Sequence, residues 1–554
     1  MTDAGSPRPI PVPPMHPFLW GTPEEARPLG RGTRGLLSNF LGLNPDSGSR
    51  PELADVRLSE PMLDDDDRAA LENIVGAGAV SSDRDQRLGR ARGKSYLDLL
   101  DWRSGDVIEA PDVCVAPGSA EEILAVLELC SERGIAVVPF GGGSSVVGGV
   151  NPERDRHRAV ISVDLARFRD VEDLDEVSGE VTLGAGLTGP EAERLLGEKG
   201  WSLGHFPQSF PYATIGGYAA TRSSGQDSAG YGRFDDMVRG LTVVTPTGIA
   251  DTGRAPASAA GPDLREVFLG SEGAFGVIAK VRVRVHRAPE VVRHEAYRFP
   301  DFAAGAAGLR EVAQLGAGPT VIRLSDEIES SVNLTSGDSI GDGSRAPEGC
   351  LCLTMFEGTA EHAASRHAET RALLIAAGGT PAGEGPVRSW EQGRFGAPVL
   401  RDGLLDNGAI CETLETATDW SNVARLKKAV TRALADTLRS TGTMALVMCH
   451  VSHVYREGCS LYFTVIAAQS DDPEAQWWAA KGAACRAIVD NGGTITHHHS
   501  IGTDHAPYLA DEIGDLGVAV LRAVKSELDP AGIMNPGKLL TIEGSGEGVS
   551  RDER

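Results

Sequence analysis

A run of glycines that directly follows a short apolar segment constrains this chain more than any other feature. Residues 139–149 read PFGGGSSVVGG, and residues 135–138 before them are interpreted as a buried strand. Adjacent glycines have no Cβ and allow positive φ, so successive backbone N–H groups can point into one concavity that suits a pyrophosphate. The run matches neither a Walker A loop nor the Gly-x-Gly-x-x-Gly fingerprint. Taken alone, such a run is a flexible turn about as often as it is a binding loop. The residues predicted to bind a cofactor here are Pro139, Phe140, Gly141, Gly142, Gly143, Ser144 and Ser145.

Length and charge limit the class of protein. A chain of 554 residues exceeds what one hydrophobic core serves, so two or three domains are expected. The net charge of −25 and the pI near 5.0 argue against nucleic acid as a partner and against a broad surface for an anionic membrane, although a local basic patch would permit peripheral contact. The eight cysteines lack Cys-x-x-Cys pairs, and no stretch resembles a membrane span or a signal peptide. We therefore expect a cytoplasmic protein with reduced thiols.

Hydrophobic periodicity divides the chain into α+β units. Apolar residues at helical spacing predict helices over 121–132, 421–437 and 508–528, and alternation predicts strands over 159–165, 179–183, 277–285, 349–356 and 460–467. The Pro-rich stretch over 1–51 predicts an irregular arm, to which no function is assigned. We divide the chain into an N-terminal arm and helical region (1–107), a cofactor-binding domain (108–289), a second α+β domain (290–490), a C-terminal segment (491–541) and a disordered tail (542–554).

Further glycine-rich segments accompany the glycine loop, over 208–217, 221–232, 270–278 and 529–538. Each is rich in glycine where a loop must let backbone approach a ligand closely. Taken in this order, the segments resemble the PCMH-type FAD-binding domain of the vanillyl-alcohol-oxidase family of flavoproteins. The further cofactor-binding residues that this predicts are Gln208, Ser209, Thr214, Gly217, Thr221, Arg222, Ser223, Ser224, Gly270, Glu272, Gly273, Gly276, Val277, Ile278 and Asn535.

The resemblance implies an α+β fold in which two small α+β subdomains hold an extended FAD. An α+β cap domain covers the flavin ring, and the C-terminal segment returns to the flavin. Covalent members of the family carry a histidine or cysteine beside the ring, and no histidine occurs within residues 140–150. We therefore expect FAD to be bound non-covalently. Homodimerisation is expected from the resemblance only.

Four segments of the cap and of the C-terminal region carry a closer resemblance. They read RFGAPVLRD (394–402), CETLETA (411–417), CSLYF (459–463) and HHHSIG (497–502), and they are similar to the alkyl-dihydroxyacetone-phosphate synthase family. The resemblance implies exchange of the acyl group of acyl-dihydroxyacetone phosphate for a fatty alcohol, in ether lipid synthesis, with flavin N5 as a covalent scaffold and no net redox. By position, Tyr462 matches the acid/base tyrosine and Arg401 the arginine that holds the substrate phosphate. The essential histidines are matched by His497, His498 and His499.

The chemistry of these residue types is consistent with such roles. Removing a proton next to a ketone needs a positioned base, which a phenol or an imidazole can supply, and a guanidinium fork matches two phosphate oxygens. Two positions depart from the family pattern: Ala257 stands where the family has an arginine, and Ser500 stands where glycine is usual. The first departure bears on substrate handling and leaves FAD binding untouched.

Simpler roles stay open for the same residues. On a strand, His497 and His499 would share one face and could bind zinc with His450, His453 or His505, but no thiolate or carboxylate spacing supports this and no metal is predicted. The histidines could equally be ordinary hydrogen-bonded residues.

Three other candidates also have simpler interpretations. Tyr462 could be strand packing, and Arg401 could form a solvated ion pair with Asp402. Glu272 could order its own loop without touching FAD.

The main rival hypothesis is a redox enzyme, an FAD-linked dehydrogenase or oxidase of a 2-hydroxy acid of the lactate or glycolate type. Those members of the superfamily usually carry a cap motif of the form His-x-x-Asp-Gly-Asn-x-His, which this chain lacks. A third hypothesis is a catalytically silent binding protein that keeps the fold, and the visible absorbance of bound oxidised flavin would test it. The preferred reading predicts two partners, a lipid-like phosphorylated ketone and a fatty alcohol.

Overall fold

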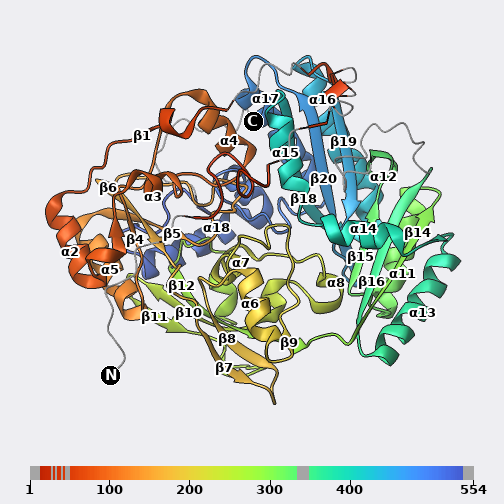
Figure 1. Ribbon diagram of the computed structural model, residues 1–554, viewed down its shortest axis with the longest axis horizontal. Coiled ribbons are helices and arrows are strands. Elements are labelled where there is room, and N and C mark those ends of the chain that lie inside the picture. Colours follow the sequence, from red (N-terminus) through yellow and green to blue (C-terminus); the bar gives the residue numbers. More distant parts are fainter. Residues whose placement is uncertain are drawn as a thin grey trace.

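The computed structural model describes residues 11, 13–26, 29–30, 34–35, 37–38, 41–43, 50–332 and 348–540. Three larger sheets organise these residues (Figure 1), with four and five strands in the N-terminal half and seven strands in the middle of the chain. Helices cover the sheets, so the α+β class predicted from the sequence is confirmed. The predicted tail over 542–554 lies outside the described residues.

The four-stranded sheet carries the glycine loop. Its order is β2 (Val80–Ser81), β4 (Val113–Val115), β6 (Ala159–Asp164) and β5 (Ile135–Phe140), and β4, β6 and β5 run parallel. Helix α5 (Ala120–Arg133) connects β4 to β5 and buries an apolar stripe against the sheet together with α2 (Asp65–Val75). The Ser119 hydroxyl caps the start of α5, and Gly134 at φ +63° ends it. The helix therefore returns the chain to β5, whose carboxyl end opens into residues 141–149.

The five-stranded sheet forms the second subdomain of the N-terminal half. Its order is β11 (Gly248–Asp251), β10 (Val238–Thr245), β12 (Val277–Arg284), β8 (Glu180–Gly184) and β7 (Val171–Asp175), all antiparallel. Helices α6 (Gly189–Gly197) and α7 (Ile215–Thr221) pack into its apolar core. Strand β12 alternates buried valines with partly exposed basic residues, as the sequence predicts.

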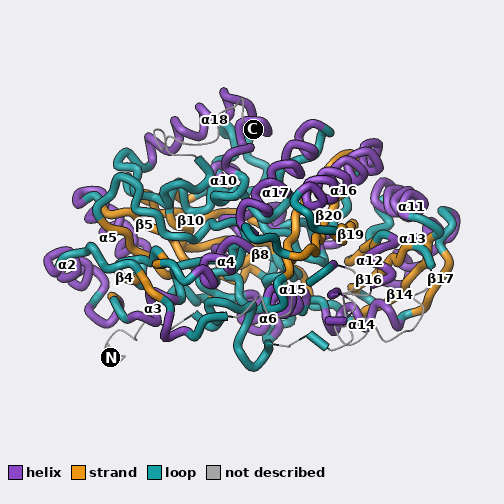
Figure 2. The backbone as a smooth tube through the Cα atoms, turned by 90° about the horizontal axis from the view of Figure 1, so that it is seen from above, coloured by secondary structure: helices purple, strands orange, loops and turns teal. Residues whose placement is uncertain are grey.

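The seven-stranded sheet forms the cap. Its order is β17 (Thr380–Gly383), β14 (Val291–Phe299), β16 (Cys350–Gly358), β15 (Val321–Ser325), β19 (Ala445–Val451), β20 (Gly458–Ala468) and β18 (Ala409–Asp419). Figure 2 shows α16 (Val423–Ser440) and α17 (Pro473–Asp490) on one side of β19 and β20, with α14 (Gly385–Gly393) and α15 (Ala397–Leu405) on the other side of the cap. Helices α11 (Phe302–Leu315) and α13 (Ala360–Ala376) cover β14, β15 and β16.

The remaining elements are short. They are β1 (Arg57–Leu58), β3 (Val107–Ile108), β9 (Trp201–Ser202), β13 (His286–Arg287), α3 (Arg84–Leu88), α4 (Tyr96–Ser104), α8 (Ser228–Tyr231), α9 (Phe234–Met237), α10 (Arg265–Phe268) and α12 (Glu327–Val332). All eight cysteines are buried and free, as predicted. No helix among the described residues combines the length and the apolarity that crossing a membrane requires.

The C-terminal segment returns to the N-terminal half, as the resemblance implies. Figure 1 shows α18 (Leu509–Leu528), in blue, beside the orange and yellow elements of that half. After the helix, Met534 forms a parallel bridge with Val137 of β5, and the Asn535 N–H donates to the Val137 carbonyl at 2.8 Å. The end of the described chain therefore lies against the strand that leads into the glycine loop.

The prediction of an irregular N-terminal arm holds for residues 13–26, whereas the described residues 34–35, 37–38 and 41 are helical, and part of the arm is a built component of the fold. Over 13–26 it contains no helix or strand, yet Phe18, Leu19 and Trp20 are buried. The ammonium group of Lys94 donates to the carbonyls of His16 and Pro17 at 2.7 and 2.9 Å. The backbone N–H of Trp20 also donates to a carboxylate oxygen of Asp402, in the cap, at 2.6 Å. This part of the arm joins the two halves of the molecule.

Candidate active site

The glycine loop needs its glycines because neighbouring groups occupy the space that a Cβ would take. A Cβ on Gly141 would lie 2.3 Å from Thr214 Oγ1, and one on Gly142 would lie 2.1 Å from the Tyr212 carbonyl oxygen. Gly143 has φ +65°, which an L-residue with a side chain rarely adopts. The segment over 208–217 is therefore packed directly on the loop, as expected if both border one dinucleotide.

Other predicted cofactor segments meet at the same loop. A Cβ on Gly273 would lie 2.8 Å from Pro139 Cγ, so the 270–278 segment packs on the end of β5. The Asn535 amide donates to the carbonyls of Gly149 and Glu272 at 3.1 and 2.6 Å, while its buried Oδ1 has no hydrogen-bond partner. Backbone without side chains lets a ligand approach closely, and the unpaired Asn535 Oδ1 leaves a buried polar atom for that ligand to satisfy. Both features fit a polar ligand such as FAD.

Several predicted cofactor residues use their side chains to hold protein rather than to face a ligand. The Ser145 hydroxyl accepts from the Gly149 N–H at 2.9 Å, and Thr221 Oγ1 donates to the Gly217 carbonyl at 2.9 Å. Arg222 pairs with Glu266 and, at 3.5 Å, with Asp235. The cofactor role of these side chains stays a prediction.

The rest of the predicted set is placed as follows. The Thr214 hydroxyl caps α7 by accepting from the Gly217 N–H, and the Ser209 carbonyl accepts from the Tyr212 and Ala213 N–H groups. Gln208 Nε2 is buried without a hydrogen-bond partner. Gly270, Gly276, Val277 and Ile278, at the start of β12 and before it, lie in the same assembly of segments as Phe140, the last residue of β5, and Ser144 in the loop after it.

Glu272 links the glycine-rich segments of the N-terminal half to the histidine segment, residues 497–502. Its buried carboxylate accepts from the N–H groups of Ile501 and Gly502 at 2.9 to 3.1 Å. Burial raises the pKa of Glu272 to about 7, against the stabilising hydrogen bonds from Gly502 and Ser500. Glu272 therefore orders the backbone at residues 501–502, a different segment from its own loop.

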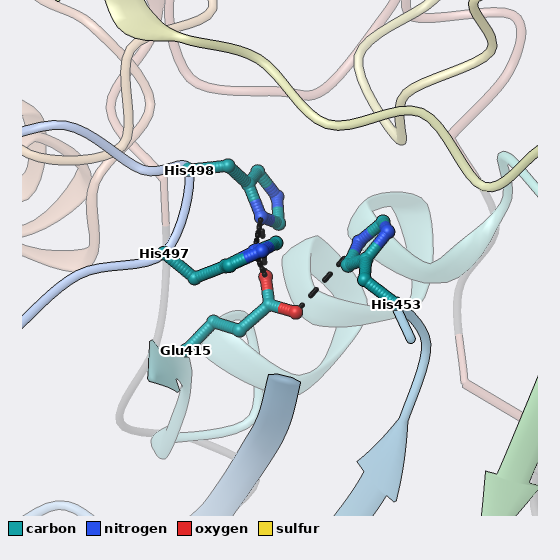
Figure 3. Close-up of side chains that lie close together, drawn as sticks. All are labelled: Glu415, His453, His497 and His498. Carbon is teal, nitrogen blue, oxygen red and sulfur yellow. Dashed lines mark hydrogen bonds and ion pairs between the residues drawn. The ribbon is translucent and has the colours of Figure 1, made fainter. Parts of the chain in front are cut away.

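A buried carboxylate of the cap lies against three histidines, one from the cap and two from the C-terminal segment (Figure 3). Glu415 of β18 is 2% exposed, and its side chain points at the rings of His453, His497 and His498. His498 Nδ1 contacts Glu415 Oε2, His497 Nδ1 lies 3.6 Å from the same oxygen, and His453 Nε2 lies 3.7 Å from Oε1. The pKa of Glu415 lies well below its ordinary value, because the His498 and His497 charges outweigh the effect of burial.

The outer nitrogens of two of these rings are held by other segments. His453 Nδ1 lies 3.0 Å from Ser224 Oγ and 2.7 Å from Ser228 Oγ, both in the N-terminal half. His497 Nε2 lies 2.5 Å from the Tyr455 hydroxyl oxygen. The histidine cluster therefore sits where the cap meets the predicted flavin segment over 221–232. The Ser223 hydroxyl in that segment bonds His205 instead, at 3.0 Å.

Tyr462 lies at the edge of this cluster. It is paired across the sheet with Glu415 on one side and His450 on the other, and its ring stacks on His450 at 4.7 Å. The His499 ring meets Tyr462 edge-on at 5.9 Å and lies 4.7 Å from the ring of His498. Burial, with help from nearby carboxylates, raises the pKa of Tyr462 above its ordinary value. Burial and the neighbouring His498 lower the pKa of His499 to about 3, so its imidazole is neutral at pH 7.

Arg401 lies apart from the histidines. It is buried on α15 and donates to the Lys94 carbonyl at 2.6 Å, while its Nη2 is 3.6 Å from Asp402 Oδ1. In the described part of the chain its polar contacts are with these two residues, and its buried Nε and Nη2 have no hydrogen-bond partner. The ion pair considered for Arg401 and Asp402 is present, but it is buried rather than solvated.

The geometry also bears on the zinc alternative. Residues 497–499 form no strand, so His497 and His499 do not share a face in the way that alternative assumed. Among the described residues, a group that could hold an ion consists of Glu415, His453, His497 and His498, whose ligand atoms lie within 4.8 Å of one another. His499 instead contacts Tyr462 and His498.

The departures from the family pattern have clear structural settings. Ala257 lies in an exposed loop between β11 and α10 with φ +51°. Ser500 is buried and has φ +75°, which is the backbone conformation that favours glycine. The second departure therefore places a strained residue directly after the histidine triplet.

Comparison with known proteins agrees with this architecture. Residues 111–252 match the family described as FAD binding domain, and residues 288–539 match the family described as FAD linked oxidases, C-terminal domain. An alkyldihydroxyacetonephosphate synthase of Trypanosoma brucei brucei is 32% identical over 517 residues, which cover 90% of this chain and 84% of that protein. A solved structure of alkyldihydroxyacetonephosphate synthase is 27% identical, with a TM-score of 0.76, and the match covers 91% of this chain and 92% of that one. A probable mitochondrial D-lactate dehydrogenase of Danio rerio is 27% identical over 447 residues, which cover 78% of this chain and 85% of that protein.

These matches, with the fold and the cradle, define a flavoprotein whose cofactor is FAD and whose N-terminal half has the PCMH-type FAD-binding fold. Within that class, the chain belongs to the alkyldihydroxyacetonephosphate synthase family and is an FAD-dependent enzyme. The family resemblance read from the sequence is confirmed. Non-covalent attachment of the FAD stays a prediction.

Sequence reasoning missed the residues that organise the histidines. Glu415 lies in the CETLETA segment, Ser228 lies within the predicted segment 221–232 and Tyr455 stands shortly before the predicted segment 459–463, but none of the three was selected. The available signal was the position of Glu415 in a strand beside the strand of Tyr462, and using it requires knowing that β18 pairs with β20. Pairing between strands about 45 residues apart is not readable from local pattern.

Proposed function

We propose that this enzyme exchanges the acyl group of acyl-dihydroxyacetone phosphate for a fatty alcohol, giving an alkyl ether and a free fatty acid. The observation that carries the proposal is the position of Tyr462 against His450 and His499, where cap and flavin-binding segments meet. Family membership supports the same reaction. When bound, the flavin supplies N5 as the atom that holds the substrate carbon during the exchange, so no net redox change occurs.

Two groups bear on the proton chemistry. Tyr462 retains its proton, because its pKa is raised, and is suited to donate a hydrogen bond or a proton. His499 is neutral, because its pKa is about 3, so it can accept a hydrogen bond but is a weak base for the proton removed next to the ketone. Two buried nitrogens of Arg401, Nε and Nη2, have no hydrogen-bond partner, although Nη2 also lies 3.6 Å from Asp402 Oδ1, and we assign the substrate phosphate to this guanidinium.

The competing hypothesis is FAD-linked oxidation of a 2-hydroxy acid, which the similarity to a probable D-lactate dehydrogenase keeps open. The absence of the His-x-x-Asp-Gly-Asn-x-His motif favours the exchange reaction. The proposal also includes a cytoplasmic location, a homodimer and a peripheral contact with the membrane that carries the lipid substrate.

A product assay separates the two hypotheses. Purified holoenzyme with acyl-dihydroxyacetone phosphate and a long-chain alcohol should give alkyl-dihydroxyacetone phosphate and fatty acid in equal amounts, measured by mass spectrometry. Arg401→Met should raise KM for the phosphorylated ketone by about 10- to 100-fold, since charge-assisted hydrogen bonds are lost. Anaerobic bleaching of the flavin by lactate or glycolate, without ether product, would instead establish the redox hypothesis.

A further inference from the structure

Unpaired buried polar atoms gather around Arg401, where the cap meets the N-terminal arm. They are Arg401 Nε and Nη2, Asp402 Oδ1 and the indole nitrogen Nε1 of Trp20, and none has a hydrogen-bond partner among the described residues. The three residues are connected, because the backbone N–H of Trp20 donates to Asp402 Oδ2 and Asp402 follows Arg401 on α15. All three are at most 7% exposed. Buried donors in folded proteins are nearly always paired, so three unpaired donors in linked residues indicate a site for an acceptor.

Arg401 presents the edge of its guanidinium group that suits a phosphate. Its Nη1 donates to the Lys94 carbonyl at 2.6 Å, which fixes the group from the other side. Nε and Nη2 lie on one edge of the planar group, and two parallel N–H bonds from such an edge match two oxygens of a phosphate. Asp402 Oδ1 lies 3.6 Å from Nη2, which makes an ion pair but is too long for a hydrogen bond. Asp402 therefore orients this edge without occupying it.

The arm holds Trp20 in one orientation. Besides the hydrogen bond from its backbone to Asp402, Trp20 meets the ring of Tyr212 edge-on, with ring centroids 6.4 Å apart. The turn before Trp20 is fixed by the ammonium group of Lys94, which donates to two of its carbonyls at 2.7 and 2.9 Å. A donor that is already fixed loses little entropy when a ligand binds. Trp20 is therefore suited to recognise a ligand with its indole N–H.

Tyr212 connects this place to the glycine loop. Its carbonyl oxygen lies where a Cβ on Gly142 would have to be, and its hydroxyl donates to Glu25 of the arm at 2.6 Å. The arm therefore contacts both the residues beside Arg401 and the segment that packs on the loop predicted to bind the FAD pyrophosphate. A ligand held by Arg401 and Trp20 would be bordered by the cap, the arm and the flavin-binding segments.

We propose that the N-terminal arm completes the site for the substrate phosphate, with the indole N–H of Trp20 and the Nε–Nη2 edge of Arg401 donating to different phosphate oxygens. Lys94 is a positioning residue for both donors, because its carbonyl accepts from Arg401 and its ammonium group donates to the arm. The inference rests on the proposed function in taking a phosphorylated ketone as the ligand. It gives the irregular arm a role in substrate binding.

An unpaired indole by itself does not indicate a site. Trp102 and Trp201 also have buried indole nitrogens without a hydrogen-bond partner in the described part of the chain. Trp20 differs from them because it is bonded to the residue next to Arg401. Trp102 of α4 is the matched control, since its ring packs on Phe18 of the arm with ring centroids 5.3 Å apart. Trp102→Phe therefore makes the same chemical change and disturbs the packing of the arm elsewhere.

The test follows the indole N–H of Trp20 in holoenzyme labelled with ¹⁵N-tryptophan. The chain has seven tryptophans, and the NMR signal of Trp20 is assigned by its loss in Trp20→Phe. The probe is dihydroxyacetone phosphate, and its control is dihydroxyacetone, which lacks the phosphate. The same titration of Arg401→Met shows whether the two donors act on one ligand. KM and kcat of the exchange reaction are measured for Trp20→Phe and Trp102→Phe.

Dihydroxyacetone phosphate should move the Trp20 signal until the site is saturated in wild type and in Trp102→Phe, and should not move it in Arg401→Met. Dihydroxyacetone should leave it in place throughout. Trp20→Phe should raise KM for the phosphorylated ketone about 10- to 100-fold, because a hydrogen bond to a charged group is lost. Its kcat should stay within about twofold of wild type, since the phosphate is bound equally before and during the reaction. Trp102→Phe should keep the wild-type KM and kcat.

A Trp20 signal that stays in place while calorimetry shows the probe to be bound would overturn the inference. Equal rises of KM in Trp20→Phe and Trp102→Phe would also overturn it, because the arm would then contribute packing alone. Should Trp20→Phe fail to fold, wild-type holoenzyme still decides. An indole signal that moves in wild type and Trp102→Phe but not in Arg401→Met supports the site, and seven unmoved signals contradict it.

Failure of the inference and failure of the proposed function give different results, because the titration needs no turnover. Movement of the Trp20 signal without any ether product would support the phosphate site and contradict the exchange reaction. Ether product formed by Trp20→Phe with the wild-type KM would support the exchange reaction and contradict the phosphate site.

Discussion

The two halves of the site differ in construction. The flavin half is formed by the glycine-rich segments, and the cap half is formed by Glu415, Tyr462 and the histidines. The flavin half is backbone: glycines whose Cβ positions are filled by Tyr212 and Thr214. The cap half consists of side chains, with the buried Glu415 and the half-buried Tyr462 among imidazoles. Substitutions in the flavin half should therefore act through packing and FAD retention, whereas those in the cap should act through rate and pH dependence.

The largest effect should come from the cap. Tyr462→Phe removes the hydroxyl and keeps the ring stacked on His450, so the protein should fold and retain FAD. We expect kcat for the exchange reaction to fall by about 10²–10⁴-fold, which is the usual contribution of a positioned acid or base. Steady-state product formation, normalised to flavin absorbance, measures this.

A buried tyrosine elsewhere in the cap provides the control. Tyr297 of β14 donates from its hydroxyl to Glu295 at 2.6 Å, away from the histidine cluster. Tyr297→Phe should change stability slightly and leave kcat per bound flavin unchanged. If Tyr462→Phe behaved like Tyr297→Phe, Tyr462 would be strand packing and the cap would lose its proton donor.

The two halves also differ in how far the sequence predicts them. The glycine loop follows β5 directly, and its function depends on residues adjacent in the chain, so local pattern finds it. The histidine triplet is equally visible, but its organiser is not. Glu415 reaches His498 only because β18 lies beside β20 in the cap sheet and the 491–508 segment crosses them, and no local periodicity encodes that arrangement.

Hydrophobic pattern predicts elements well and misjudges the N-terminal arm. Helix α5 and strand β12 are found almost to the residue, because a single buried face dictates their spacing. The arm over 13–26 has no such period, yet Lys94 and Asp402 fix it through its backbone carbonyl and N–H groups. Tertiary hydrogen bonds to the main chain leave no signature in the sequence of the segment they hold.

An intermediate effect is expected where the halves join. Glu272 is uncharged below its raised pKa of about 7, whereas its ordinary value is 4.5, so the folded state binds an extra proton between these values. Its contribution to stability is therefore fully present below pH 4.5 and is lost as the pH rises through 7, by up to about 3 kcal/mol. Glu272→Gln can still accept from Ile501 and Gly502 and should not show this loss.

Melting temperatures of wild type and Glu272→Gln from pH 5 to pH 8 measure the difference. The variant should be the more stable protein at pH 8, and the gap should close toward pH 5. Parallel curves over that range would mean that Glu272 stays ionised, and that the two halves are held together by an anion accepting from backbone N–H groups.

The smallest effect on stability should come from the flavin half. Gly142→Ala places a methyl group against the Tyr212 carbonyl, so the loop and the 208–217 segment must separate, at about 1–3 kcal/mol. Gly197→Ala, at the end of α6 where a Cβ meets nothing within 4 Å, is the matched control and should be neutral or slightly stabilising. Thermal unfolding and flavin absorbance measure both variants. Gly142→Ala should lose FAD while its remaining holoenzyme keeps the wild-type pH profile. A shifted pH profile with full FAD occupancy would contradict the separate roles of the two halves, because the glycine loop would then influence the charges of the cap residues.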